Sequence, residues 1–303
     1  MEDKLNKRLL HGLSGLKIDL DCLSCTLKMA SRNARLVTED IKLQRKIVIE
    51  VIKSLESVSW DFIPIELAFI VNRVISEVTG NPDPFKELRK RSNDMVLKIY
   101  PELKKIVENS SDKLETAVKL SAAGNSIDLG AYLQLDLHES IDKAMRGSFM
   151  INDYKEFRER VLKAEDMIYF LDNAGEIVLD KLLIETMLDV RSRPFRSINL
   201  VVKGGPAIGD AIPEDVRYVG LDKLPNVEVR SVSNGVEGTG PSMSSEVVRG
   251  WIRQHDLRIF KGQANYETYD DEADSFFILM VKCPIVAKAI GASMGSFVLK
   301  HSR

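Results

Sequence analysis

The stretch MIYFLDNAGEIVLDKLLIETMLDVRSRPFRSINLVVK, residues 167–203, decides the fold class. Its apolar runs MIYFL (167–171) and INLVV (198–202) have the length and composition of buried strands. Between them, EIVLDKLLIETML (176–188) has the pattern of an amphipathic helix. A strand, a helix and a second strand in this order predict a parallel pair joined by a right-handed crossover.

The same alternation continues towards the C-terminus. Further strand candidates are VEVRSV (227–232), LRIF (257–260) and FFILMV (276–281), and helical patterns cover 245–254 and 284–290. The second of these helices has Pro284 in its first turn and Gly291 after its end, a typical arrangement. The pattern predicts an α/β fold with a layered, largely parallel sheet.

The first half of the chain has a helical period instead. Apolar residues recur at spacings of three and four over 41–55 and 66–78, and helical patterns also cover 85–99, 113–122 and about 138–146. No segment before residue 150 is convincing as a strand. We therefore expect a helical domain over residues 1–148 and an α/β domain over residues 149–303.

Composition excludes several classes of protein. The 303 residues are 44% hydrophobic and 29% charged with a net charge of −2, so neither nucleic acid nor a membrane surface is expected as a partner. No apolar run approaches the ~20 residues of a membrane span. Three cysteines cannot form a disulfide framework, which favours a reducing, cytoplasmic location. The oligomeric state is not indicated.

Polar residues follow four of the predicted strands. Ligands of parallel α/β sheets bind at the carboxyl ends of the strands, so these residues are the first candidates for a site. In chain order they are Asp172, Asn173 and Glu176; Lys203 and Asp210; Lys261, Gln263, Asn265 and Glu267; and Lys282.

Asp172, Asn173 and Asp210 offer oxygen ligands without a nearby His or Cys, which suits Mg²⁺ or Mn²⁺ rather than Zn²⁺. One strand–helix–strand unit separates the two aspartates, so they can meet at adjacent strand ends. The alternative is that Asp172 and Asn173 cap the next helix.

Lys261 and Lys282 each follow an apolar strand directly, where an ammonium group would suit a phosphate in the crevice. For Lys282, the alternative is an exposed lysine at the start of the next helix. The segments GGPAIGD (204–210) and GTGPS (238–242) match neither dinucleotide nor P-loop motifs, and turn glycines explain them more simply.

Cys22 and Cys25 form the motif CLSC within a helical pattern. At positions i and i+3 they share one face of the helix. A lone CxxC leaves structural packing, metal binding and a redox role open.

The motifs LDNAGE (171–176), GGPAIGDA (204–211) and KGQANYE (261–267) together resemble the metal-dependent damage-control phosphatase family, first described as domain of unknown function eighty-nine. The CLSC motif resembles its CxxC-bearing, prokaryotic and archaeal subfamily. The resemblance extends over nearly the whole chain and includes AAGNSIDLG (122–130) and VKC (281–283). It implies a helical N-terminal domain packed on a Rossmann-like α/β domain.

The resemblance also implies roles for individual residues. Asp172, Asn173 and Asp210 would bind a divalent cation (Mg, Mn, Co or Ni), and Glu176, Asn265 and Lys282 would contact substrate, with Lys282 near the phosphate. Asn125 and Asp128 would line the same crevice from the helical half. The eukaryotic branch tends to have Asp at the position of Gln263 and an Arg-Thr-x-Lys motif where this chain has Leu-Met-Val-Lys ending at Lys282, which affects the substrate rather than the metal.

The expected activity is hydrolysis of small phosphate monoesters, such as sugar phosphates or phosphopantetheine-like esters. One of the aspartates would act as general base or as nucleophile, and Lys282 would offset charge on the phosphoryl oxygens. Two other classes stay open: a carboxyl methyltransferase that uses S-adenosylmethionine, and a non-catalytic metal or metabolite binder.

Overall fold

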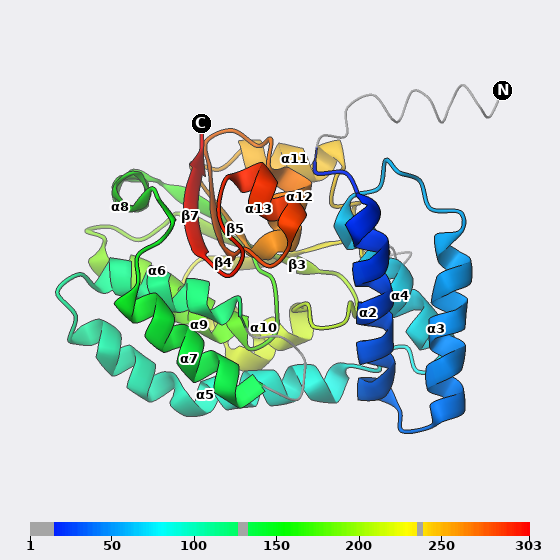
Figure 1. Cartoon of the computed structure of the whole chain (residues 1–303). Coiled ribbons are helices and arrows are strands. Elements are labelled where there is room, and N and C mark those ends of the chain that lie inside the picture. The colour runs from blue at the N-terminus through cyan, green and yellow to red at the C-terminus, as the bar shows by residue number, and fades with distance from the viewer. Residues whose placement is uncertain (1–14, 127–132, 235–238) are drawn as a thin grey trace.

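The computed structural model describes residues 15–126, 133–234 and 239–303. Its centre is a seven-stranded sheet with the order β1-β7-β6-β5-β2-β3-β4 (Figure 1). All neighbouring strands are parallel except β6 and β7, so the predicted largely parallel sheet is confirmed. The strands are β1 (Ile151–Asn152), β2 (Asp166–Phe170), β3 (Ser197–Lys203), β4 (Val227–Val232), β5 (Leu257–Lys261), β6 (Ser275–Met280) and β7 (Phe297–Ser302).

Helices fill the described chain before residue 150 and separate most of the strands after it. The first group is α2 (Leu20–Val37), α3 (Ile41–Leu55), α4 (Pro64–Thr79), α5 (Lys86–Glu108), α6 (Lys113–Gly124) and α7 (Leu133–Arg146). The second is α8 (Tyr154–Lys163), α9 (Glu176–Val190), α10 (Pro213–Val219), α11 (Glu246–Arg253), α12 (Gly262–Tyr269) and α13 (Pro284–Ile290). The α/β class with a helical N-terminal half is therefore confirmed.

Successive residues of each strand supply two hydrophobic cores, one on either face of the sheet. In β2, Met167 and Tyr169 pack with residues of α5, α6, α8 and α9, whereas Ile168 and Phe170 pack with residues of α11, α12 and α13. Burial on both faces explains why the strands appear in the sequence as continuous apolar runs rather than alternating ones.

Helices α2, α3 and α4 form a separate bundle beside the sheet (Figure 1). Their own small core contains Ala30, Ile47, Val71 and Ile75, with Phe85 from the segment that precedes α5. Helices α5 and α6 instead share the large core under the sheet. The division at residues 148 and 149 stays a prediction, because the hydrophobic cores separate the α2–α4 bundle rather than the whole helical half.

The order in which strands are added to the sheet reverses between the parallel neighbours β2 and β5. From β2 the chain goes to β3 and β4 on one side, and from β5 it goes to β6 on the other. Diverging connections leave a crevice outside the carboxyl ends of the two strands, where open α/β sheets bind ligands. Asp172 follows β2 and Gly262 follows β5, so the fold places the candidate residues at this crevice.

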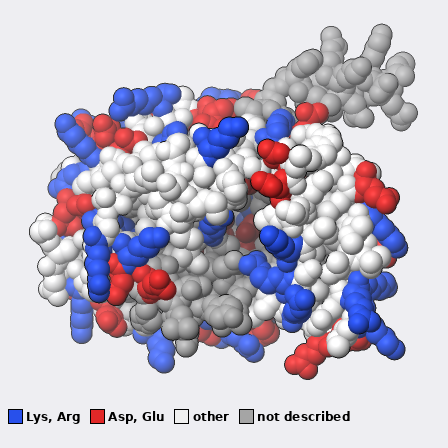
Figure 2. All heavy atoms as spheres, in the orientation of Figure 1, with Lys and Arg blue, Asp and Glu red and all other residues white. Residues whose placement is uncertain are grey.

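Within the described chain, no helix combines the length and apolar character needed to cross a membrane. Lys, Arg, Asp and Glu side chains are interspersed over the face drawn in Figure 2. This mixture agrees with the net charge of −2.

Candidate active site

Main-chain hydrogen bonds join the segment after β2 to the segment after β3. Asn173 and Asp210 form an isolated antiparallel bridge, in which the amide of Ala174 donates to Gly209 O (2.9 Å) and that of Ala211 to Asp172 O (2.8 Å). The predicted convergence of the two aspartates therefore follows from backbone pairing. The alternative that Asp172 or Asn173 caps α9 through its side chain finds no support, because Gly175 occupies the N-cap position and no side-chain cap bond is present at this described helix end.

A network of amides and carboxylates surrounds Asp172. Its Oδ2 accepts hydrogen bonds from Asn125 Nδ2 (2.9 Å) and Asn173 Nδ2 (2.8 Å), and both amides also donate to the Glu176 carboxylate. Asn125 Oδ1 accepts from the Met280 amide (3.0 Å), which links α6 to the end of β6.

Gly262 allows β5 to approach Asp172 closely. Its φ is +76°, and a Cβ atom at this position would lie 1.8 Å from Asp172 Oδ2 and 2.9 Å from Asn125 Nδ2. A side chain here would overlap the carboxylate, so the glycine of KGQANYE is required by contact as well as by backbone conformation.

Three carboxylates are buried together at this point. Burial raises the pKa of Asp172 well above its usual range, and the charges of Glu176 and Asp210 raise it further. Burial also raises the pKa of Asp210, against the nearby ammonium of Lys203, whose Nζ is 3.9 Å from Asp210 Oδ2. Both pKa values are raised because the buried charged form is disfavoured, and a bound cation would stabilise that form.

Lys261 lies in the interior and not in the crevice. Its side chain is 0% exposed, and Nζ donates to Glu176 Oε1 (2.9 Å), Asp180 Oδ1 (2.7 Å), Ser121 Oγ (2.7 Å) and Ser121 O (2.9 Å). These four acceptors occupy the ammonium group, so this placement does not meet our expectation that it faces a phosphate. The physical reason is the pair of buried carboxylates on α9, which require a cation.

Two other expected substrate contacts also lie behind the crevice. Asn265 is 1% exposed and donates to Leu171 O and Lys261 O, which ties the start of α12 to the ends of β2 and β5. Glu176 is 0% exposed, and burial, which alone would raise its pKa, is outweighed by Lys261, so its pKa is lowered. Asp128 lies outside the described residues.

A pocket of about 540 Å³ opens in front of the carboxylates. Asp172, Asn173 and Asp210 form part of its wall, and the exposed side chain of Lys282 lines it as well. The opposite wall belongs to α2 and α4, which contribute Lys28, Met29, Ile65 and Ala68 among others. The site therefore lies between the sheet edge and the helical bundle.

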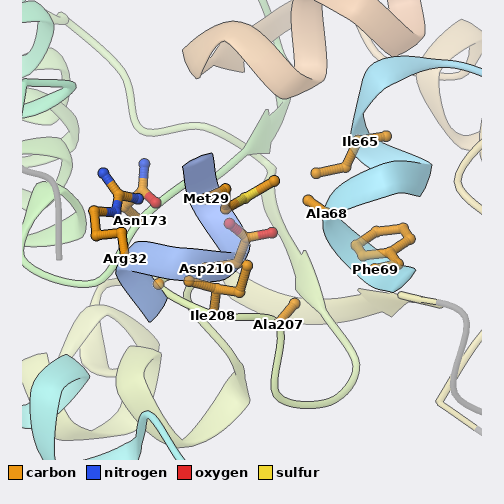
Figure 3. A pocket seen from close by; sticks show the side chains of 10 residues that line it. Met29, Arg32, Ile65, Ala68, Phe69, Asn173, Ala207, Ile208 and Asp210 are labelled. Atoms are coloured by element: carbon orange, nitrogen blue, oxygen red, sulfur yellow. The ribbon is translucent and has the colours of Figure 1, made fainter. Parts of the chain in front are cut away.

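A smaller pocket of about 150 Å³ adjoins the first and shares Asn173 and Asp210 with it. In Figure 3 the Asp210 carboxylate lies between α2, which contributes Met29 and Arg32, and α4, which contributes Ala68 and Phe69. Arg32 is therefore a basic residue that lines the smaller pocket together with Asp210.

All three cysteines line the large pocket, together with Gln263 and Glu267 of α12. Gln263 Nε2 donates to Glu267 Oε1 (2.9 Å) and contacts Cys283 Sγ (3.3 Å), while Gln263 Oε1 accepts from the Lys282 amide (2.9 Å). Burial raises the pKa of Cys22 and of Cys283 above the usual thiol value, which keeps both thiols neutral near pH 7.

The donor atoms fit a hard divalent cation. Asp210 Oδ2 is buried and has no hydrogen-bond partner among the described residues, although a buried carboxylate oxygen normally has one. The described residues hold no group of three His, Cys, Asp or Glu side chains arranged for a metal. Two carboxylates and the Asn173 amide would thus supply part of the coordination, and Mg²⁺-like ions usually complete theirs with water or phosphate oxygens.

Lys203, Gln263 and Glu267 were among the strand-end candidates but received no predicted role, and Asp180 was missed. The first three follow predicted strands, so their signal was the same strand-end position that selected Asp172. Asp180 has a different signal, because it is an acid between the apolar segments 177–179 and 182–184 and lies four residues after Glu176.

Fold and site together define an α/β protein with an oxygen-donor cluster and a lysine-lined pocket at a reversal of strand order. Comparison with known proteins is more specific. The profile of the damage-control phosphatase ARMT1-like domain matches residues 18–298. The chain belongs to this family.

Curated relatives agree. The chain is 30% identical to damage-control phosphatase PH1575 of Pyrococcus horikoshii over 95% of its own length and 99% of that protein. It is 33% identical to a damage-control phosphatase of Archaeoglobus fulgidus, over 94% and 99% of the two chains. The crystal structure of the DUF89 family protein from P. horikoshii superposes with a TM-score of 0.81 and covers 95% of this chain and 100% of the other. The family supports a phosphatase, and therefore a hydrolase, that acts on damaged metabolites.

Proposed function

We propose that the protein is a divalent-metal-dependent phosphatase that hydrolyses small phosphate monoesters, such as sugar phosphates or phosphopantetheine-like esters. The observation that carries the proposal is the cluster of Asp172, Asn173 and Asp210 in the pocket wall, where a buried carboxylate oxygen of Asp210 accepts no hydrogen bond from the described residues. The pocket volume of about 540 Å³ is within the range of small-ligand sites.

Asp172, Asn173 and Asp210 would hold Mg, Mn, Co or Ni. A bound cation of this kind polarises phosphoryl oxygens and lowers the pKa of water. The rest of the chemistry belongs to the chain: an aspartate of the pair would accept a proton from the attacking water or attack phosphorus itself. Lys282, at the pocket wall, would stabilise charge on the phosphoryl oxygens. A compartment follows from none of these residues, and the cytoplasm remains our expectation.

The test is release of inorganic phosphate by chelator-treated protein from a panel of small phosphate esters, with Mg²⁺, Mn²⁺, Co²⁺ or Ni²⁺ added back singly. We expect turnover only in the presence of a cation and without S-adenosylmethionine. Equal turnover in chelator would contradict the metal dependence. Failure on the whole panel would favour a metabolite binder, and methyl transfer from S-adenosylmethionine would favour the methyltransferase.

Lys282→Ala should lower kcat/KM by on the order of 10², because the lysine would meet the charge that develops on the phosphoryl oxygens in the transition state. The affinity for Mn²⁺, measured by calorimetry, should change little, since the donor atoms remain. Lys282→Arg should restore little activity, because a planar guanidinium does not replace a compact ammonium.

The matched control is Lys288→Ala, an exposed lysine of α13 outside the pocket wall, which should leave kinetics unchanged. Near-normal kinetics for Lys282→Ala would shift the role to Lys203, because the ammonium of Lys261 is already occupied by four acceptors.

A further inference from the structure

The pocket is also lined by a buried carboxyl group that is not among the proposed metal ligands. Glu267 is 4% exposed and lines the same pocket as Asp172, Asp210 and Lys282. It forms no ion pair with any cation of the described chain, unlike Glu176 and Asp180 behind the site. A buried carboxyl without a cation next to a ligand pocket costs stability, which calls for a functional reason.

Helix α12 fixes the distance between Glu267 and the metal cluster. The helix begins at Gly262, whose α-carbon abuts Asp172 Oδ2, and Glu267 is five residues further along. At about 1.5 Å per residue, Glu267 lies roughly 7.5 Å along the helix axis from that contact. Glu267 lines the same pocket as Asp172 and Asp210, so an ester bound at the cluster would extend along this wall towards Glu267.

The surroundings of Glu267 favour the protonated form of its carboxyl group, so that a substantial fraction is protonated near neutral pH. The charge of Glu267 adds to burial in raising the pKa of Cys22 of α2 and of Cys283, which precedes α13, so both are neutral thiols there. Lys282, Lys28, Asp21 and Cys25 line the same pocket, and α4 presents only Pro64, Ile65, Leu67 and Ala68 to it. Burial raises the pKa of Glu267 to about 7, against the stabilising hydrogen bond from Gln263.

The amide of Gln263 also orients the carboxyl group. It donates to Glu267 Oε1 at 2.9 Å, and its own oxygen is held by the Lys282 amide. Glu267 Oε1 is therefore the hydrogen-bond acceptor, and Glu267 Oε2 is the oxygen that would carry the proton.

We infer that Glu267 is the general acid of the reaction, which protonates the leaving oxygen of a phosphate monoester bound in this pocket. The inference rests on the proposed phosphatase function. In the step, the bond from phosphorus to the alcohol oxygen breaks, its electron pair stays on that oxygen, and the proton of Glu267 Oε2 moves to it. Water supplies the oxygen that phosphorus gains, and one of its protons restores the acid.

The test compares two esters in wild type and Glu267→Gln. An alkyl phosphate needs a proton on its leaving alcohol, whereas p-nitrophenyl phosphate releases a phenolate that does not. We expect Glu267→Gln to lower kcat for the alkyl ester by roughly 10²–10⁴, the usual contribution of a general acid, and to leave p-nitrophenyl phosphate within about threefold. Glu159→Gln, an exposed residue of α8, is the matched control and should change neither rate.

An equal loss of kcat on both esters would overturn the inference and indicate a structural role. A raised KM with unchanged kcat would also overturn it and would indicate a contact to a substrate hydroxyl. Wild type provides an independent test if the variant fails to fold. Alkyl-ester turnover should fall as pH rises through about 7 because the acid form is lost, whereas aryl-ester turnover should lack this decline. Coincident profiles would contradict the assignment. Absence of turnover of either ester by wild type would instead refute the phosphatase.

Discussion

Asp172→Asn is expected to reduce kcat/KM by on the order of 10³, about 4 kcal/mol of transition-state stabilisation. The substitution keeps the size of the side chain but removes the charge that a divalent cation would meet in the pocket wall. An asparagine oxygen can still accept from Asn125 and Asn173, so the hydrogen-bond network that surrounds Oδ2 remains possible.

The thermal stability of the metal-free variant, unlike its activity, should not fall. Asp172, Glu176 and Asp210 are three carboxylates buried together, and removing one charge relieves repulsion in the metal-free protein. Thermal unfolding in chelator should therefore show Asp172→Asn to be at least as stable as wild type, while calorimetry should show weaker Mn²⁺ binding. Normal turnover by this variant would mean that the metal site is misassigned.

The strands that were predicted correctly are those with continuous apolar runs. β2, β3, β5 and β6 match the expected positions to within a residue or so at each end, and β4 coincides with residues 227–232. β7 was not predicted, because only the first half of FVLKHS is apolar and its outer residues are half-exposed. The helix α12 was missed because KGQANYE has little apolar content. Its buried Tyr266 and Tyr269 nevertheless belong to the same hydrophobic core as Phe260 of β5 and Phe277 of β6.

The sequence likewise placed some residues of the candidate site correctly and others not. Where backbone topology decides position, as for Asp172, Asn173 and Asp210, the strand-end rule sufficed. Where a side chain has a choice of direction, sequence position did not suffice. Lys261 and Lys282 both follow apolar strands, yet one turns inwards to the α9 carboxylates and the other remains at the pocket. The difference is made by Glu176 and Asp180, whose positions relative to β5 depend on the tertiary fold.

The long helix α5 shows how tertiary packing extends a pattern beyond its apparent end. The sequence predicted a helix over 85–99, whereas α5 continues to Glu108 through Pro101. Leu103 and Val107, beyond the proline, are buried in the large core with residues of α6 and α9. Their burial offsets the lost hydrogen bond at the proline.

The buried cation at Lys261 should dominate the stability of the site. Lys261→Met keeps the length of the side chain and leaves Glu176 and Asp180 in the interior without a cation, a change that typically costs about 3–5 kcal/mol. At roughly 2–4 °C per kcal/mol for a chain of this size class, the melting temperature should fall by about 6–20 °C. Activity should fall as well, because Glu176 accepts hydrogen bonds from the two amides that hold Asp172.

Two further variants separate this explanation from a simple packing defect. Lys104→Met removes an exposed partner of Glu185, at 3.4 Å, and should cost less than about 1 kcal/mol. The triple variant Lys261→Met, Glu176→Gln, Asp180→Asn removes the uncompensated charges and should regain most of the lost stability, though not the activity. If Lys261→Met alone unfolds at the wild-type temperature, the ion pairs contribute nothing to stability. If the triple variant is no more stable than the single one, the loss comes from packing and not from unpaired charge, because the triple variant no longer contains the uncompensated carboxylates.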